Sequence, residues 1–160
     1  MRLLIVAVGC GRAGPERRLA DDYLDRARRL APRLGFRGLD VIEIDESRRR
    51  EAALRRDEEA AALLAASPEG AALIALDEHG ENLSSPGFAR RLAALRDEGR
   101  PGTCFLIGGP DGHGPMLECR ATLSLAFGAA TWPHLLVRVL LAEQIYRAMT
   151  ILSGHPYHRP

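Results

Sequence analysis

The sequence predicts an α/β protein with a mostly parallel sheet flanked by helices. Short apolar runs rich in Val, Ile and Leu alternate along the chain with longer segments rich in Ala, Arg and Glu. This alternation is typical of parallel strands that are joined by helices. No linker, repeat or low-complexity stretch interrupts the pattern, so residues 1–160 are expected to form one domain.

The first half of the chain is expected to contain three strands and two helices. The run Leu3–Val8 is apolar throughout, as in a strand buried on both faces. Pro15 stands just before an Arg-rich amphipathic segment, and proline is favourable at the start of a helix. In chain order, the predicted elements are a strand at Leu3–Val8, a helix at Arg17–Leu34, a strand at Leu39–Asp45, a helix at Arg48–Ala66, a strand at Ala71–Leu76 and a turn at Asp77–Gly80.

The second half of the chain repeats the alternation. Ser84 or Ser85 is expected to cap a helix that ends near Glu98, because a serine oxygen can accept a hydrogen bond from a free amide of the first turn. The remaining predicted elements are a strand at Thr103–Ile107, a loop at Gly108–Gly114, a short helix, a strand at Leu123–Phe127, a loop at Gly128–Trp132 and a last helix from His134 to Leu152 after Pro133.

Composition and charge exclude several classes of protein. The net charge is +1 and all 22 basic residues are arginine, so the chain lacks the global basic field that usually marks nucleic-acid-binding proteins. Any RNA contact is expected to come from a local patch or from a surface formed by two subunits. Cys10, Cys104 and Cys119 are odd in number and have no close metal-ligand spacing, which indicates free thiols in a reducing compartment. No stretch approaches the roughly 18 apolar residues of a membrane span. We therefore expect a cytoplasmic protein with no metal, no membrane and no DNA partner.

A glycine pattern near the amino terminus suggests one alternative function. Gly9, Gly11 and Gly14 form G-x-G-x-x-G between the first strand and the first helix, as in dinucleotide-binding loops. Asp45 ends the next strand, but it lies farther along the chain than the roughly 20 residues of that fingerprint. We therefore interpret the glycines as a flexible turn and keep a nucleotide-binding, Rossmann-like oxidoreductase as the alternative.

Two loops in the carboxy-terminal half are candidate ligand sites. Gly108–Gly112 follows the fourth strand, and paired glycines let a ligand approach the backbone without interference from Cβ atoms. Phe127–Trp132 combines small residues, whose backbone polar groups can bond an adenine edge, with aromatic residues that can wall a pocket. Each loop taken alone is also explained as a plain turn or connection.

The last helix and the tail are the most unusual segments. The helix is apolar around most of its circumference, which predicts burial in a core or against a second subunit. Arg138 lies alone among apolar residues and needs a structural carboxylate or an anionic ligand. In the tail, His155, Tyr157 and His158 can stack on an unpaired base while Arg159 meets phosphate, although a solvated terminus is the simpler interpretation.

Taken together, these segments resemble the RlmH family of the SPOUT superfamily of methyltransferases. The segments that carry the resemblance are Leu76–Asp77 with Gly80 and Ser84–Ser85, Ile107–Gly112, Trp132–His134, Leu136–Val139, Ala142–Ala148 and His155–Arg159. The resemblance extends over the whole chain and is most specific near the carboxy end.

The resemblance implies a trefoil knot near the carboxy end, an obligate homodimer and S-adenosyl-L-methionine bound in the knot. It implies that the target is N3 of a pseudouridine in 23S rRNA of the assembled ribosome. The cofactor-binding residues that it implies are Leu76, Gly108, Phe127, Gly128, Ala129, Ala130, Thr131 and Trp132. Family members usually carry Ser where this chain has Gly128, so a catalytically silent, dimeric ribosome-binding factor is a second alternative.

Methylation at N3 sets chemical requirements on the remaining residues. N3 of pseudouridine carries an imide proton, which must leave before or during attack on the methyl group. Donors at the flanking carbonyl groups would stabilise the resulting anion, and in-line positioning of the reactants would supply much of the acceleration. The residues expected to orient or deprotonate the base, or to place a phosphate or carbonyl oxygen, are His155, Tyr157, His158, Arg138 and Arg159.

Overall fold

A five-stranded parallel sheet forms the centre of the computed structural model, which describes residues 1–11 and 13–159. Its strands are β1 (Arg2–Val8), β2 (Leu39–Ile44), β3 (Ala72–Asn82), β4 (Gly102–Ile107) and β5 (Leu123–Ala126). Their spatial order is β2-β1-β4-β3-β5, and every neighbouring pair is parallel. The mostly parallel sheet predicted from the sequence is confirmed.

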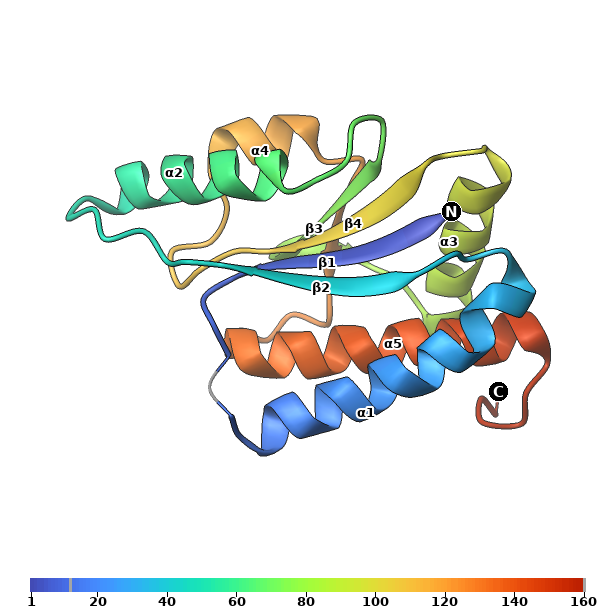
Figure 1. Ribbon diagram of the computed structural model, residues 1–160. Coiled ribbons are helices and arrows are strands. Elements are labelled where there is room, and N and C mark those ends of the chain that lie inside the picture. Colours follow the sequence, from blue (N-terminus) through green and yellow to red (C-terminus); the bar gives the residue numbers. More distant parts are fainter. Residues whose placement is uncertain (12, 160) are drawn as a thin grey trace.

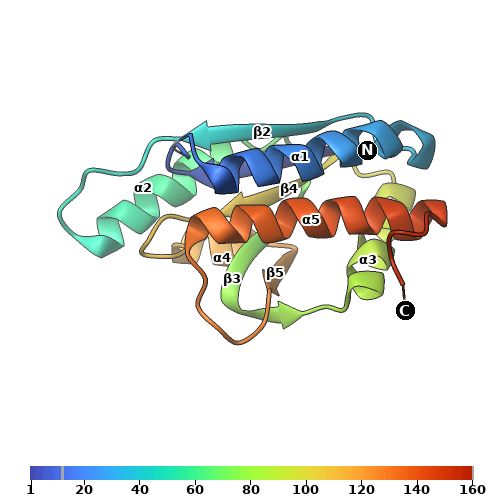
Figure 2. The same ribbon diagram turned by 90° about the horizontal axis from the view of Figure 1, so that it is seen from below.

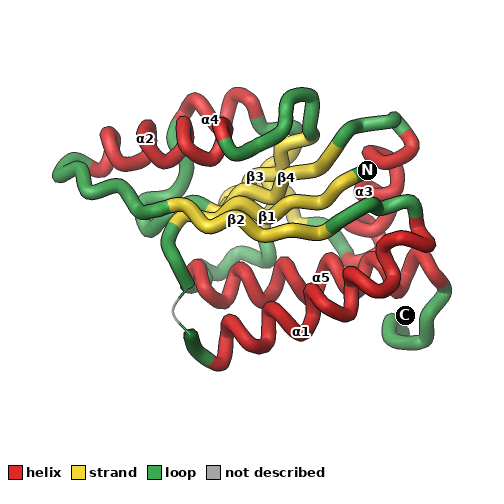
Figure 3. Tube along the Cα trace, in the orientation of Figure 1, coloured by secondary structure: helices red, strands yellow, loops and turns green. Residues whose placement is uncertain are grey.

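Helices cover both faces of the sheet (Figure 1). They are α1 (Pro15–Leu30), followed by a 3₁₀ turn at Ala31–Leu34, α2 (Ala52–Ala65), α3 (Ser85–Asp97), α4 (Pro115–Arg120) and α5 (His134–Ser153). Figure 3 shows α2 and α4 on one face and α1, α3 and α5 on the other. Seen from below, α1 and α5 lie side by side along the sheet (Figure 2).

The alternation of side chains along β1 builds a core on each face. Leu3, Ile5 and Ala7 belong to the cluster under α1, α3 and α5, while Leu4 and Val6 belong to the cluster under α2 and α4. Successive side chains of a strand point to opposite faces, so an unbroken apolar run suits a strand that is covered twice. The prediction that Leu3–Val8 is a strand buried on both faces is confirmed.

Helix boundaries follow the predicted capping in one case and differ in two. Ser84 caps α3, with its hydroxyl accepting a hydrogen bond from the backbone of Gly87 at 3.2 Å. The helix predicted to reach Leu34 changes to a 3₁₀ turn at Ala31, beside Pro32, which has no amide hydrogen to donate. The segment from Arg48 to Glu51 is not helical, and Glu51 is the extended residue before α2.

The turn predicted at Asp77–Gly80 is wrong. Strand β3 continues to Asn82, and both Leu76 and Glu81 pair with Leu125 of β5, so the residues between them bulge from the ladder. A Cβ atom on Gly80 would lie 2.7 Å from the backbone nitrogen of Leu125. The glycine here permits close contact between two strands, and it is pairing with β5 that keeps the segment extended.

Two features of the described residues bear on the expected setting. None of their helices has both the length and the apolarity needed to cross a membrane. Cys10, Cys104 and Cys119 are all free thiols, as the odd number of cysteines predicts.

Candidate functional site

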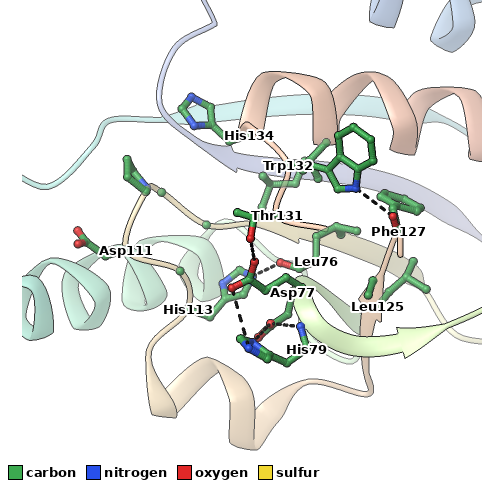
Figure 4. Close-up of a pocket in the computed structure, with 18 of the residues that line it drawn as sticks. Leu76, Asp77, His79, Asp111, His113, Leu125, Phe127, Thr131, Trp132 and His134 are labelled. Carbon is green, nitrogen blue, oxygen red and sulfur yellow. Dashed lines mark hydrogen bonds and ion pairs between the residues drawn. The ribbon is translucent and has the colours of Figure 1, made fainter. Parts of the chain in front are cut away.

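A cavity of about 380 Å³ lies at the carboxyl ends of β3, β4 and β5 (Figure 4). Three segments form its walls: the bulge of β3, the glycine-rich loop after β4 and the loop between β5 and α5. The residues predicted to bind a cofactor all line it except Ala129. Loops at the carboxyl ends of parallel strands are the usual ligand sites of open α/β sheets, so this is the candidate functional site.

The loop after β4 is a tight turn that is fixed against α2. The backbone amide of Gly112 donates to the carbonyl of Gly109 at 3.0 Å, and Gly112 has a φ of 79°, which favours glycine. Arg55 of α2 donates to both oxygens of Asp111, at 2.6 and 3.0 Å. The hydrogen bond from Arg55 lowers the pKa of Asp111. The loop is therefore both a turn and a wall of the cavity.

The loop after β5 is tied to β3 and closes the opposite wall. The amide of Gly128, at φ 95°, donates to the side chain of Asn82 at 2.7 Å. The hydroxyl of Thr131 donates to Glu78 at 2.5 Å, and the Trp132 indole donates to the Phe127 carbonyl at 3.0 Å. Trp132 nevertheless keeps 43% of its surface exposed, at the edge of the cavity.

Acidic side chains give the cavity its electrostatic character. Asp77 and Glu78 come from the β3 bulge and Glu118 from α4, while Arg56 of α2 is a basic group in the same lining. Sequence reasoning missed these residues, because they are far apart in the chain and only the strand order brings them together. Asp111 is a fourth carboxylate of the lining, but Arg55 already pairs with it. The three other carboxylates beside one guanidinium favour a ligand that carries positive charge.

Arg138 does not line this cavity. Its guanidinium donates to Glu43 of β2 and to the carbonyl oxygens of Val8 and Gly9. Of the two partners that the sequence left open, the structure supplies the structural carboxylate. Burial alone would raise the pKa of Glu43, but hydrogen bonds from the Gly11 amide and Arg138 lower it overall.

The amino-terminal glycine pattern has its polar groups occupied by the protein itself. The Gly11 amide donates to Glu43 at 2.9 Å, and the Gly9 carbonyl accepts from Arg138. A dinucleotide pyrophosphate needs free amide donors at this loop, and a carboxylate occupies the Gly11 donor. The geometry therefore favours the turn over the oxidoreductase alternative. Within the pattern, which spans residues 9–14, Arg12 lies outside the described residues, as does Pro160 at the carboxy terminus.

The tail folds back against the middle of α5. The Tyr157 hydroxyl donates to Glu143 at 3.1 Å, and its ring lies 4.7 Å from that of Tyr146 and 4.8 Å from the Arg147 guanidinium. His158 is 3.5 Å from Arg147, and His155 is exposed. Glu143 is nine residues after His134, which lines the cavity, so about 14 Å along the α5 axis separates the contact of Tyr157 from the cavity end of the helix.

The site residues predicted from sequence thus fall into three places. The residues predicted to bind a cofactor line the cavity, apart from Ala129. Arg138 joins α5 to β1 and β2, and Tyr157 and His158 lie beside the middle of α5. Sequence reasoning also missed His113, a buried histidine in the cavity wall. Across the described part of the chain, no group of three or more His, Cys, Asp or Glu side chains is arranged to hold a metal ion.

Comparisons with known proteins match this chain to methyltransferases over nearly its whole length. Residues 1–158 match a family model described as a predicted SPOUT methyltransferase. A ribosomal RNA large subunit methyltransferase H from Rhodopseudomonas palustris (strain ATCC BAA-98 / CGA009) is 60% identical over 99% of both chains. Proteins of the same name from Nitrobacter hamburgensis and Bradyrhizobium diazoefficiens are 58% and 56% identical, again over 99% of both chains. A solved SpoU methyltransferase, AviRb from Streptomyces viridochromogenes, is 14% identical with a TM-score of 0.39, covering 92% of this chain and 59% of that chain.

Proposed function

The chain belongs to the SPOUT methyltransferase family, and from that premise we propose that it methylates N3 of a pseudouridine in 23S rRNA of the assembled ribosome. S-adenosyl-L-methionine is the proposed methyl donor. The observation that carries the proposal is the cavity itself, because the residues that family resemblance assigns to the cofactor meet there from three separate strands. A cytoplasmic location follows from this target, and the trefoil knot stays a prediction.

The cavity fits the proposed cofactor. Its volume of about 380 Å³ lies within the usual range for small-molecule sites. A Cβ atom on Gly108 would lie 3.0 Å from the Gly112 carbonyl oxygen, so a side chain here would crowd this wall of the cavity. Leu76, Gly108 and the loop from Phe127 to Trp132 are the residues proposed to hold S-adenosyl-L-methionine. When bound, that molecule supplies an electrophilic methyl group on a positively charged sulfonium.

The residues of the cavity have distinct proposed roles. The carboxylates of Asp77, Glu78 and Glu118 stabilise positive charge in the cavity and hold the donor by electrostatic attraction. The half-exposed indole of Trp132 covers the opening and limits access of water. The glycine loops present backbone groups in fixed directions, which restricts the donor to one orientation.

A homodimer is part of the proposal, because one side of α5 remains apolar and accessible. Leu136 is 38% exposed, and Leu140, one turn farther along, is only partly buried. Together with Trp132, in the loop just before the helix, they form an accessible apolar surface that a second copy of α5 can cover. A two-fold interface between antiparallel α5 helices brings the carboxy end of each to the amino end of the other.

This arrangement explains why the tail lies far from the cavity of its own chain. In the proposed dimer, His155, Tyr157 and His158 of one protomer approach the cavity of its partner. Burial, together with hydrogen bonds to Tyr23 and Glu143, raises the pKa of Tyr157, so its hydroxyl stays protonated and orients rather than deprotonates the base. The imidazoles of His155 and His158 are the proposed acceptors of the imide proton.

The direct test is a turnover assay on ribosomes from cells that lack the modification. The purified protein is incubated with methyl-labelled S-adenosyl-L-methionine and intact ribosomes, and digested rRNA is analysed by mass spectrometry for 3-methylpseudouridine. We expect this product from assembled ribosomes. Cofactor binding without methylated product would reject the proposed reaction and favour a silent ribosome-binding factor.

Mixed dimers test the placement of the tail. One variant carries Leu76→Arg, which fills the cavity, and the other lacks residues 155–160. Each homodimer is expected to be inactive, whereas dimers that combine the two variants regain one intact site and part of the activity. Absence of recovery in verified mixed dimers would mean that the tail does not serve the partner's cavity.

A further inference from the structure

His113 is a buried histidine in the wall of the cavity that neither the sequence pattern nor the proposed reaction has assigned a role. It lies at the end of the glycine-rich loop after β4, is only 8% exposed and belongs to the cavity lining. Figure 4 shows its ring beside Leu76, with the hydrogen bond between them drawn. A histidine this deeply buried in a candidate site calls for a physical explanation.

The hydrogen bond determines which ring nitrogen carries the proton. His113 Nε2 lies 2.9 Å from the carbonyl oxygen of Leu76. A carbonyl oxygen only accepts, so Nε2 must be the donor, and Nδ1 is unprotonated in the neutral ring. Nδ1 is buried and has no hydrogen-bond partner among residues 1–11 and 13–159.

The hydrogen bond from His113 is made where strand β3 begins to bulge into the wall of the cavity. Leu76 is the last residue of β3 that pairs with β4, and the strand bulges immediately after it. Here the His113 imidazole donates a hydrogen bond to the Leu76 carbonyl oxygen, directly before the bulge. The same ring lies against Gly108, where an added Cβ would be 3.2 Å from the ring carbon Cε1. One imidazole therefore contacts two residues of the cavity, Leu76 on β3 and Gly108 in the loop directly after β4.

We propose that His113 is a positioning residue for the cofactor: its neutral ring holds the Leu76 carbonyl and the Gly108 backbone in the arrangement that binds the donor. The inference rests on the proposed function, because it assigns Leu76 and Gly108 to the cofactor. It adds a residue that acts through these two and contacts no reacting atom.

The charge state of the ring supports this role. Burial lowers the pKa of His113, and it outweighs the opposing effects of the Leu76 hydrogen bond and the nearby carboxylates of Asp77, Glu118 and Glu59. Arg56 of α2 is a cation in the same cavity lining. The ring is therefore neutral at pH 7. Protonation at lower pH would place a second N–H at Nδ1, where the described residues offer no acceptor.

Two variants of His113 and one control separate positioning from general stability. His113→Leu fills the space without a donor, and His113→Gln keeps an N–H group that can bond the carbonyl. The control is Thr122→Val. The Thr122 hydroxyl accepts a hydrogen bond at 3.1 Å from the amide of Leu73, which is on the same strand as Leu76, and neither Thr122 nor Leu73 lines the cavity. The readout is the dissociation constant of S-adenosylhomocysteine, measured by calorimetry between pH 5 and 8 on the full chain.

The expected result is a selective loss of affinity. Without the donor, His113→Leu weakens binding about tenfold at pH 7.5, as for a buried carbonyl that loses its partner, while His113→Gln stays within about threefold. In turnover assays the KM for the donor rises and kcat at saturating donor is unchanged. Wild type and Thr122→Val lose affinity as the pH falls through the pKa of His113, which burial places below the ordinary histidine pKa of about 6.5, whereas His113→Leu shows no such fall.

Two results would overturn the inference, and both are distinct from failure of the proposed function. Equal affinity of wild type and His113→Leu at pH 7.5 would show that the ring does not position the site. An identical pH profile in His113→Leu would assign the titration to another group. If wild type itself binds neither S-adenosylhomocysteine nor S-adenosyl-L-methionine, the proposed function fails as well.

Discussion

The Arg138–Glu43 pair provides a quantitative test of how the last helix is attached to the sheet. Arg138→Met keeps the length of the aliphatic stem and removes the guanidinium. The change leaves the Glu43 carboxylate, whose side chain is 21% exposed, without its main cation, and it leaves the carbonyls of Val8 and Gly9 without their donor. The side chain of Arg138 is itself only 13% exposed.

The expected cost follows from this geometry. Removing one partner of a buried ion pair typically costs about 3–5 kcal/mol. Glu43 keeps its hydrogen bond from Gly11 and a weaker contact with Arg17 at 3.6 Å, so the loss is placed at about 2–3 kcal/mol. In a chain of this size that corresponds to a fall of about 5–10 °C in Tm. Glu43→Gln together with Arg138→Met is expected to recover part of the loss, because the amide leaves no unpaired charge.

Urea unfolding followed by circular dichroism measures these values, at one protein concentration because a dimer is expected. Arg49→Met is the matched control: its ion pair with Glu58 has side chains 63% and 52% exposed, and its loss should change stability by less than about 0.5 kcal/mol. If Arg138→Met is as stable as the control variant, the reasoning is refuted. Lost turnover with unchanged stability would instead give Arg138 the catalytic role expected from the sequence.

Three further predictions follow from the same structure. Because the pKa of Glu43 is lowered in the folded state, its ionised form stabilises the fold above about pH 4.3, and this contribution disappears as the pH falls through the folded-state pKa. The urea midpoint of Glu43→Gln should therefore fall less steeply than that of the wild type between about pH 6 and pH 3. Parallel curves for the two proteins would contradict this. Gly80→Ala places a Cβ 2.7 Å from the backbone of β5 and should lower the free energy of unfolding, measured by thermal unfolding, by about 2–3 kcal/mol. In the control Gly38→Ala the nearest atom is 3.6 Å from the new Cβ, so stability should hardly change. Equal effects of the two substitutions would disprove the close contact. Gly128→Ala meets no atom within 4 Å but must adopt a φ of 95°, so a loss of about 1 kcal/mol is expected from backbone strain alone, and an unchanged Tm would argue against it.

Local patterns in the sequence determined the type and order of the elements. The apolar run of β1 requires cover on both faces, and the structure supplies it from α2 and α4 on one side and α1, α3 and α5 on the other. The hydroxyl of Ser84 caps its helix because the cap depends only on residues within one turn. The glycines of the loop after β4 likewise meet a requirement of their own turn. Each of these features is encoded by neighbours in the chain.

Seven of the eight residues that family resemblance predicts to bind the cofactor line one cavity, but the resemblance did not place the tail. The sequence grouped His155, Tyr157 and His158 with Arg138 as one set that would act on the base. The structure separates the tail from Arg138 by partner: Tyr157 bonds Glu143, whereas the Arg138 guanidinium bonds Glu43 and the carbonyl groups of Val8 and Gly9. The sequence contains no pattern that assigns these partners.

Only the tertiary structure decided the features that depend on residues far apart in the chain. Asp77–Gly80 carries the local signal of a turn, yet pairing with β5 keeps it in an extended strand. The anion that Arg138 requires is Glu43 on β2, and no pattern in the sequence selects that residue over the other acids. In the sequence, nothing distinguishes His113 from the other residues of its loop; the strand order brings its ring within hydrogen-bond distance of the Leu76 carbonyl oxygen. Periodicity and capping act over one or two turns, whereas these partners are set by the packing of the sheet, which is why the sequence alone does not reveal them.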